Sequence, residues 1–234
     1  MGPVRDAAVK RRASLVPKVK SDVTLPIDCP TMNDAIRYFL SPQSPWTYLG
    51  HDRFAAIAAR AGARIEVLPI DLGKLFPLSG GLPLAKRAPQ RQAYRLVELK
   101  RFAEHLGLPL TLRPKHFPVP GDAAPRLLAA VDLHDGSGSA MGLAGAMLRA
   151  VWADERDIAD PAVLAALLEA QRLPVQRLDD AAAPAAVQRF EAATQRAIDA
   201  GVFGVPTYAV GGELFWGQDR LDFLERRLAA AAAG

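Results

Sequence analysis

Two buried strands separated by one helix open the folded part of the sequence, and this order is the strongest constraint on the fold. Residues 35–40 form an apolar run that predicts a short buried strand. Ser44 and Pro45 then favour a helix start, because serine is a good N-cap and proline suits the first helical position. Apolar residues recur at helical spacing until Gly62, and residues 64–70 alternate as a second strand. Two such strands joined by a helix are predicted to be parallel, with a right-handed crossover.

The middle of the chain predicts helices, and its end returns to strands. Apolar spacing with glycine or proline boundaries indicates four helices, around residues 89–107, 141–151, 161–170 and 187–201. Residues 207–210 and 213–216 are expected strands on either side of two glycines, so they predict a hairpin. A last helix follows, with leucines at helical spacing from Leu221. This order predicts an α/β protein with a thioredoxin-like fold and an inserted all-helical domain.

The same patterns divide the chain into three parts. Residues 1–34 lack sustained periodicity, contain four prolines and have no apolar core of a secretory signal, so we expect a disordered extension. Residues 35–73 and 202–234 are assigned to the thioredoxin-like domain, and residues 74–201 to the inserted helical domain. Residues 1–31 carry six Lys and Arg against three Asp, which accounts for most of the basic pI of 9.4. We therefore predict no nucleic-acid partner for the body of the protein.

Composition and cysteine count exclude further classes of protein. Apolar residues make up 50% of the 234 positions and charged residues 23%, enough for both a core and a solvated surface. No stretch approaches the roughly 20 continuous apolar residues that a membrane span requires, so no membrane association is expected. The single cysteine, Cys29, excludes an internal disulfide and any multi-cysteine metal site. These features predict a cytoplasmic protein.

The junction of the first strand and helix is a candidate site for an anionic sulfur. A helix N-terminus carries partial positive charge and unpaired N–H groups, so it lowers the pKa of a thiol bound there. The Ser44 hydroxyl would donate a hydrogen bond to such a thiolate. The alternative interpretation, favoured by the local sequence alone, is that Ser44 only caps the helix.

Two segments near the C-terminus offer groups for a peptide-like ligand. Pro206 precedes a strand, where proline is an ordinary first residue. In a thioredoxin-like fold it would instead be a cis-proline, with Val205 offering backbone groups to the ligand. Asp219 is read either as the N-cap of the last helix or as a partner for an ammonium group, while nearby free N–H groups bind a carboxylate. That second arrangement suits the end group of an α-amino acid.

A basic cluster precedes and opens the first predicted helix of the insertion: Lys86, Arg87, Arg91 and Arg95. Most such clusters are solvated, but one cation here would serve to bind a substrate carboxylate, and Lys86 and Arg91 are the candidates. The four histidines show no metal-ligand spacing, so no metal site is predicted.

Three segments taken together resemble a known family. They are residues 38–50 (YFLSPQSPWTYLG), 201–207 (GVFGVPT) and 214–224 (LFWGQDRLDFL). They are similar to the 2-hydroxychromene-2-carboxylate isomerases and the related kappa-class glutathione transferases, a branch of the DsbA-like thioredoxin superfamily. Residues 69–73 and 91–94 fit as well, so the resemblance covers about residues 35–228.

The resemblance implies glutathione as the cofactor and gives roles to particular residues. Ser44 matches the serine that hydrogen-bonds the glutathione sulfur, and Trp46 belongs to the same motif. Val205 and Pro206 match the cis-proline element that aligns the glutathione backbone. Gln218 and Asp219 match the residues that hold the γ-glutamyl end.

Two departures bear on the chemistry. Positions 44 and 47 hold Ser and Thr where redox relatives have a Cys-x-x-Cys pair, so a disulfide oxidoreductase is excluded. Family members often carry an Asn in a Gly-Asn pair after the second strand. The nearest match here is Gly80-Gly81, so specificity cannot be copied from the family.

The expected function is therefore a glutathione-dependent isomerase that acts on an unsaturated, aromatic-derived substrate by reversible thiolate addition. The first alternative is a glutathione transferase that releases a thioether. The second is a redox-inactive thioredoxin-like module that binds peptides. The family also implies a homodimer.

Overall fold

A mixed four-stranded sheet forms the centre of the protein. The computed structural model describes residues 35–233, so the expected extension at residues 1–34, with Cys29, lies outside the described part. The strands are β1 (Ile36–Leu40), β2 (Ile65–Pro69), β3 (Thr207–Val210) and β4 (Glu213–Trp216), in the order β2-β1-β3-β4. β1 pairs parallel with β2, as the intervening helix predicts, and β3 is antiparallel to both of its neighbours.

Alternate residues of the central strands enter two separate cores. In β1, Tyr38 and Leu40 belong to the larger core and Phe39 to the smaller one. In β3, Tyr208 belongs to the larger core and Ala209 to the smaller. This period of two, with apolar residues on both faces, is what a sheet covered on both sides requires.

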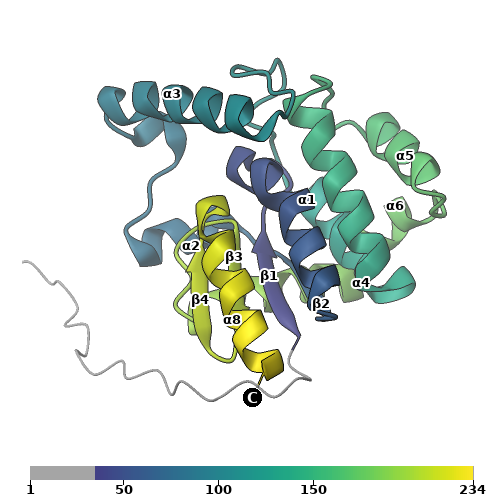
Figure 1. Ribbon diagram of the computed structural model, residues 1–234. Helices are drawn as coiled ribbons and strands as arrows, with labels where there is room; N and C mark the ends of the chain where they lie inside the picture. The colour runs from purple at the N-terminus through teal and green to yellow at the C-terminus, as the bar shows by residue number, and fades with distance from the viewer. Residues whose placement is uncertain (1–34, 234) are drawn as a thin grey trace, which may run out of the picture.

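Helices cover each face of the sheet (Figure 1). The larger core includes residues of α1 (Pro45–Arg60), of the long α4 (Ala123–Trp152) and of α8 (Leu221–Ala233). The smaller core includes residues of α2 (Leu72–Ser79) and α7 (Pro184–Asp199). The other helices are α3 (Pro89–Leu106), α5 (Pro161–Ala170) and α6 (Arg177–Asp180), with short 3₁₀ turns η1 (Leu84–Lys86) and η2 (Gln218–Arg220).

The predicted strands, the hairpin and the helix beginning after Ser44 are all confirmed. Three helical segments were not predicted: α2, the first half of α4 and the four-residue α6. In α4, Gly136 has a φ of +83° and a ψ of 167°, so the helix is kinked there. The Asp-Gly-Ser-Gly-Ser run around that glycine indicates a loop by composition, and the structure has a break between two helical segments there.

Helix α7 is bound tightly to the sheet, although the predicted division places it in the helical insertion. Arg196 of α7 donates hydrogen bonds to both carboxylate oxygens of Glu66 in β2, at 2.5 and 2.7 Å. This hydrogen-bonded contact lowers the pKa of Glu66, because it stabilises the carboxylate form. The helical domain at residues 74–201 remains a prediction from the sequence. The contacts of α7 with β2 connect that predicted domain to the thioredoxin-like one.

Candidate functional site

One cleft collects most of the predicted site residues. Its volume is about 580 Å³, and its walls come from α3, the start of α1, the loop before β3 and the turn before α8. Among the predicted residues, the ones that line it are Trp46, Arg91, Val205, Gln218 and Asp219. Segments more than 150 residues apart in the chain therefore meet in this cleft.

The start of α1 has one amide, that of Trp46, without a partner among the described residues. Pro45, at the first helical position, has no N–H group, and the amide of Thr47 donates to the Ser44 Oγ at 3.2 Å. The amide of Tyr48 donates to the Ser44 carbonyl at 3.0 Å. The amide of Trp46 therefore has no partner within the described part of the chain, and Trp46 lines the cleft. A helix start in this state favours an anion.

Ser44 is the N-cap that the sequence predicts. As a cap it accepts a hydrogen bond, so its hydroxyl hydrogen is not used. The Oγ accepts from Thr47, so the hydroxyl hydrogen remains available to an acceptor. The two interpretations of Ser44 are thus compatible. The residue is only 7% exposed and does not line the cleft itself, although Trp46, two residues further along the chain, does. The Thr47 Oγ1, fully buried, has no partner among the described residues.

The loop before β3 presents free backbone groups. The Val205–Pro206 bond is cis, as expected for a thioredoxin-like fold. The Pro206 carbonyl accepts from the Gly217 amide at 2.9 Å, which joins this loop to the turn before α8. Neither the N–H nor the C=O of Val205 has a partner in the described structure. An extended peptide backbone lying along Val205 would pair with both.

Gln218 is the most buried polar residue of the cleft wall, at 1% exposed. Its Oε1 accepts from the Arg53 guanidinium at 3.2 Å, whereas its Nε2 has no partner among the described residues. Arg53 also contacts Asp222 of α8, at 3.3 Å. A buried donor without an acceptor is costly, so an acceptor such as a carboxylate that reaches the Gln218 Nε2 would remove that cost.

Asp219 follows Gln218 in the same turn. It is not the N-cap of α8, so the interpretation of Asp219 as the cap of the last helix is wrong. It lies within η2, and α8 begins at Leu221. Gly217 precedes it with a φ of +104°, and a β-carbon on Gly217 would lie 2.5 Å from the Asp219 Oδ1. Arg220 donates to Asp219 at 2.7 Å, on an exposed part of the cleft rim. The Asp219 Oδ1 remains available for an ammonium group.

Helix α3 and the residues just before it supply a positively charged wall. Arg87, Arg91 and Arg95 all line the cleft, whereas Lys86 does not. Of the two residues predicted to bind a substrate carboxylate, Arg91 lies in the cleft wall and Lys86 does not. Aromatic rings complete the cleft: Trp46 meets Phe102 of α3 edge-on at 6.1 Å between centroids, and Trp216 packs against Phe203 at 4.6 Å.

Several of these residues escaped prediction for identifiable reasons. Arg53 lies on the polar face of α1, where nothing local distinguishes it from a solvated arginine. Phe102 and Trp216 belong to apolar patterns that predict core positions. The single signal for Trp216 was its place two residues before Gln218 in the segment that carries the resemblance.

The Gly80-Gly81 pair does not contribute to the cleft. Gly80 ends α2 with a φ of +74°, and a β-carbon on Gly81 would lie 2.4 Å from the Phe76 ring. Neither residue is among those that line the cleft. The position of the family Asn is thus occupied by a helix end that excludes a side chain.

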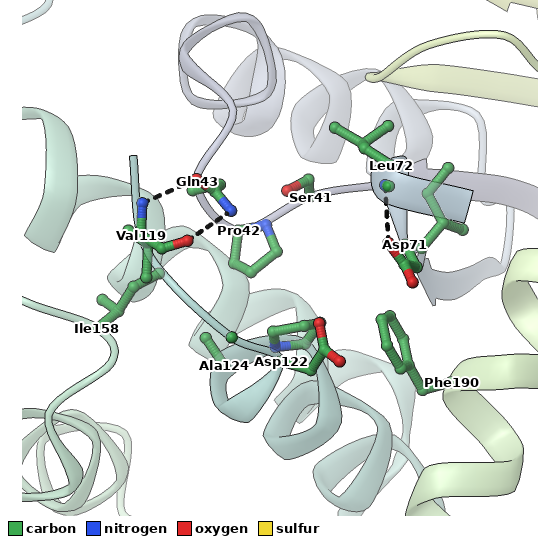
Figure 2. A pocket seen from close by; sticks show the side chains of 14 residues that line it. Ser41, Pro42, Gln43, Asp71, Leu72, Val119, Asp122, Ala124, Ile158 and Phe190 are labelled. Carbon is green, nitrogen blue, oxygen red and sulfur yellow. Dashed lines mark hydrogen bonds between the residues drawn. The ribbon is translucent and has the colours of Figure 1, made fainter. Parts of the chain in front are cut away.

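A second, smaller cavity of about 110 Å³ lies beside the ends of β1 and β2 (Figure 2). At its edge, the side-chain amide of Gln43 donates to the Val119 carbonyl at 3.2 Å and accepts from the Val119 amide at 3.0 Å. The Trp152 indole also donates to the Gln43 carbonyl, at 3.3 Å. These contacts fix the residue before Ser44 against the helical part of the protein. Gln43 therefore positions the start of α1.

Within residues 35–233 no group of three His, Cys, Asp or Glu side chains is arranged to hold a metal ion. Among the histidines, His51 is buried between Tyr38 and Met141. Its Nδ1 lies 3.1 Å from the Tyr38 hydroxyl and its Nε2 lies 3.1 Å from the Met141 carbonyl. None of the described helices combines the length and apolar character that crossing a membrane requires.

Comparisons with known proteins bear on the family and the fold. Residues 35–229 match the family described as DSBA-like thioredoxin domain. The chain is 28% identical over 201 residues to a 2-hydroxychromene-2-carboxylate isomerase of Pseudomonas sp. (strain C18), covering 84% of this chain and 91% of that protein. It is 29% identical over 199 residues to a protein of the same name from Sphingobium xenophagum, covering 84% and 99%.

Solved structures of similar proteins have the same fold. A 2-hydroxychromene-2-carboxylate isomerase matches with a TM-score of 0.72 and 25% identity, covering 85% of this chain and 96% of that chain. A probable DsbA oxidoreductase from Streptomyces coelicolor matches with a TM-score of 0.68 and 20% identity, covering 86% and 91%. The second similarity concerns the fold alone.

Proposed function

The chain belongs to the family of DSBA-like thioredoxin domains, and from this we propose that it is a glutathione-dependent isomerase of the 2-hydroxychromene-2-carboxylate isomerase type. The DsbA-like thioredoxin fold predicted from the sequence is confirmed, as is the resemblance to those isomerases. The substrate class in this proposal is an unsaturated, aromatic-derived organic compound.

One observation carries the proposal: three residues from distant segments line the same cleft, and each has polar groups without a partner among the described residues. The unpaired groups are the Trp46 amide, the N–H and C=O of Val205, and the buried Nε2 of Gln218. Their chemistry matches the parts of glutathione. An amide at a helix start suits a thiolate, free backbone groups suit a peptide, and a buried amide donor beside a carboxylate suits an α-amino acid end.

When bound, glutathione supplies a thiolate for reversible addition to a conjugated double bond, so that the bond rearranges and the cofactor is released unchanged. The residues of the chain hold and orient the reactants. Ser44 donates its hydroxyl hydrogen to the sulfur, and the start of α1 stabilises the negative charge. Val205 aligns the peptide backbone, while Gln218 and Asp219 bind the γ-glutamyl end. Alignment of two reactants in one cleft removes much of the entropic cost of their encounter.

A product analysis with 2-hydroxychromene-2-carboxylate and stoichiometric glutathione tests the proposal. We expect a product with the mass of the substrate, and glutathione recovered in full. A covalent adduct of the two masses would show a transferase instead. Turnover without glutathione would reject the cofactor, and absence of both turnover and glutathione binding would favour a peptide-binding module.

A matched pair of variants connects this reaction to the cleft. Asp219→Ala removes the partner of the ammonium group, and we expect loss of turnover at low glutathione with partial recovery at high glutathione. Glu225→Ala removes an exposed carboxylate of α8 that pairs with Arg60 instead, at 2.7 Å, and should leave turnover unchanged. Equal behaviour of the two variants would contradict the assigned role of Asp219.

A further inference from the structure

The α3 wall of the cleft, taken with Arg87 just before the helix, contains positive charge that no carboxylate of the described residues neutralises. Four arginines and two carboxylates line the cleft, and neither carboxylate pairs with Arg87, Arg91 or Arg95: Glu98 pairs with Arg101 at 2.7 Å, and the Asp219 Oδ2 pairs with Arg220 at 2.7 Å. Arg87, Arg91 and Arg95 all line the cleft, and among the described residues no carboxylate lies within salt-bridge distance of any of them.

Arg95 differs from a solvated arginine because aromatic rings hold it. Its guanidinium carbon lies 5.4 Å from the centroid of Phe117 and 5.7 Å from that of Trp152. Trp152 is fully buried, so this support is rigid. Burial and the charge of Arg87 lower the pKa of Arg95 to about 10. The side chain is thus fixed in position and partly stripped of water, without an opposite charge among the described residues.

Arg87 is fixed as well, at the start of the same wall. Its Nε donates to the Leu82 carbonyl at 2.8 Å, and its own carbonyl accepts from the Gln92 side chain at 2.7 Å. Burial and the charge of Arg91 lower its pKa. Two like charges held near one another in a partly buried wall repel each other, and a bound anion relieves that repulsion.

From this geometry we propose that Arg87 and Arg95 form a carboxylate-binding site for the organic substrate, and that Arg95 determines the preference for an anionic over a neutral substrate. The inference rests on the proposed function, in which Val205, Gln218 and Asp219 are occupied by glutathione. The α3 wall is then left to the second reactant. A planar guanidinium matches a carboxylate through two parallel hydrogen bonds, and the aromatic rings of the cleft suit a flat substrate body.

Equilibrium binding of two matched probes tests the site without turnover. We would titrate the protein with 2-naphthoate and with its neutral counterpart 2-naphthamide, in the absence of glutathione. The wild type should bind the carboxylate at least about tenfold more tightly, as expected for a charge-assisted bidentate contact. Arg95→Leu should lose this preference, and Arg95→Lys should recover only part of it because ammonium lacks the planar fork.

A control on the same helix separates a local site from general electrostatics. Lys100 is exposed on α3 and pairs with Glu104 at 3.7 Å, outside the cleft. Lys100→Met removes the same charge and should keep the full preference for 2-naphthoate. Thermal unfolding of each variant confirms that it is folded at the temperature of the titration.

A glutathione titration of the same variants shows whether the site binds the carboxylate of the organic substrate or the glycine carboxylate of glutathione. If Arg95→Leu binds glutathione as the wild type does and has lost the preference for 2-naphthoate, the proposal is supported. If Arg95→Leu weakens glutathione but not γ-glutamylcysteine, the site binds the glycine carboxylate and the proposal is overturned. A wild type that binds the two naphthyl probes equally also overturns it, whatever glutathione does. If the wild type does not bind glutathione but prefers 2-naphthoate, the proposed function is rejected and the carboxylate-binding site is still supported.

Discussion

Gly50 of α1 lies so close to Gln218 that a β-carbon on the glycine would be 2.7 Å from the Cβ of Gln218. The same β-carbon would be 2.9 Å from the Tyr208 hydroxyl. Real β-carbons do not tolerate such contacts, so only glycine lets the helix and the turn before α8 approach this far. This close approach brings the amide of Gln218 to the cleft that begins at the N-terminus of the same helix.

Gly50→Ala should therefore displace the Gln218 turn. We expect a loss of about 1–3 kcal/mol in the free energy of unfolding, as for other overpacked positions. Urea denaturation measures this loss. Gly138→Ala in α4 is the matched control, because a β-carbon there meets nothing within 4 Å and alanine favours a helix. The control should be neutral or stabilising, and a comparable loss in both variants would contradict the packing argument.

Ser44→Ala should have two separable effects. Loss of the cap destabilises the helix by about 1 kcal/mol, and loss of the hydroxyl donor raises the pKa of the bound glutathione thiol. Asp160→Ala removes another N-cap, whose side chain accepts from the Ala162 amide at 2.8 Å in α5. That control should lower stability without changing the thiol pKa, which is read from thiolate absorbance. An unchanged thiol pKa in Ser44→Ala would reject the catalytic role of Ser44.

Arg53 acts as a positioning residue for Gln218. Arg53→Met should weaken glutathione binding about tenfold, because the Gln218 side chain loses the charged donor that orients it. Arg60→Met is the control on the same helix, since Arg60 also bridges to α8, through Glu225, but does not contact Gln218. Calorimetry of both variants gives the comparison. Restored affinity in Arg53→Lys would show that charge alone suffices.

Gln43 joins the segment before Ser44 to the helical part through both amide contacts with Val119. Gln43→Ala leaves the Val119 amide and carbonyl without these partners, so we expect a loss of about 1–3 kcal/mol in the free energy of unfolding. Gln195→Ala serves as the control, because Gln195 makes only an exposed contact with Asp199. Equal stability of the two variants would show that water replaces the lost contacts.

His51 makes stability depend on pH. Burial lowers its pKa below the ordinary value of 6.5 in the folded state, so the unfolded chain binds the extra proton first as pH falls. The free energy of unfolding should therefore decrease as pH falls below 6.5, until the pH reaches the folded-state pKa. The denaturation midpoint measured across this range in His51→Phe should lose much of the slope. The exposed His105→Asn should keep it.

The fold was predictable where local signals agree with tertiary structure. Ser44 and Pro45 mark a helix start by two independent preferences, and Gly211 with Gly212 marks the hairpin. The helix α2 was missed because Gly73 and Pro77 lie within its eight residues, and both disfavour a helix in isolation. Asp71 caps it through hydrogen bonds to the amides of Gly73 and Lys74, so the capping and the packing of Leu75 outweigh propensity.

The site was predictable only where motif residues touch the cleft directly. Val205, Gln218 and Asp219 come from segments that carry the resemblance. Arg53 and Arg95 depend on tertiary contacts across long sequence separations, namely with Gln218 and with Trp152. No local pattern in the sequence distinguishes an arginine that orients a buried amide from one that is solvated.

The central claim is that this cleft binds glutathione through its γ-glutamyl end, and a calorimetric titration tests it most directly. Wild-type protein titrated with glutathione should show one site per chain, and Asp219→Ala should bind at least about tenfold more weakly. Asp219→Ala should weaken the binding of S-methylglutathione by the same factor as the binding of glutathione, since residue 219 is assigned to the γ-glutamyl end and not to the sulfur. No heat of binding by the wild type at millimolar glutathione, in a protein shown to be folded, would contradict the account.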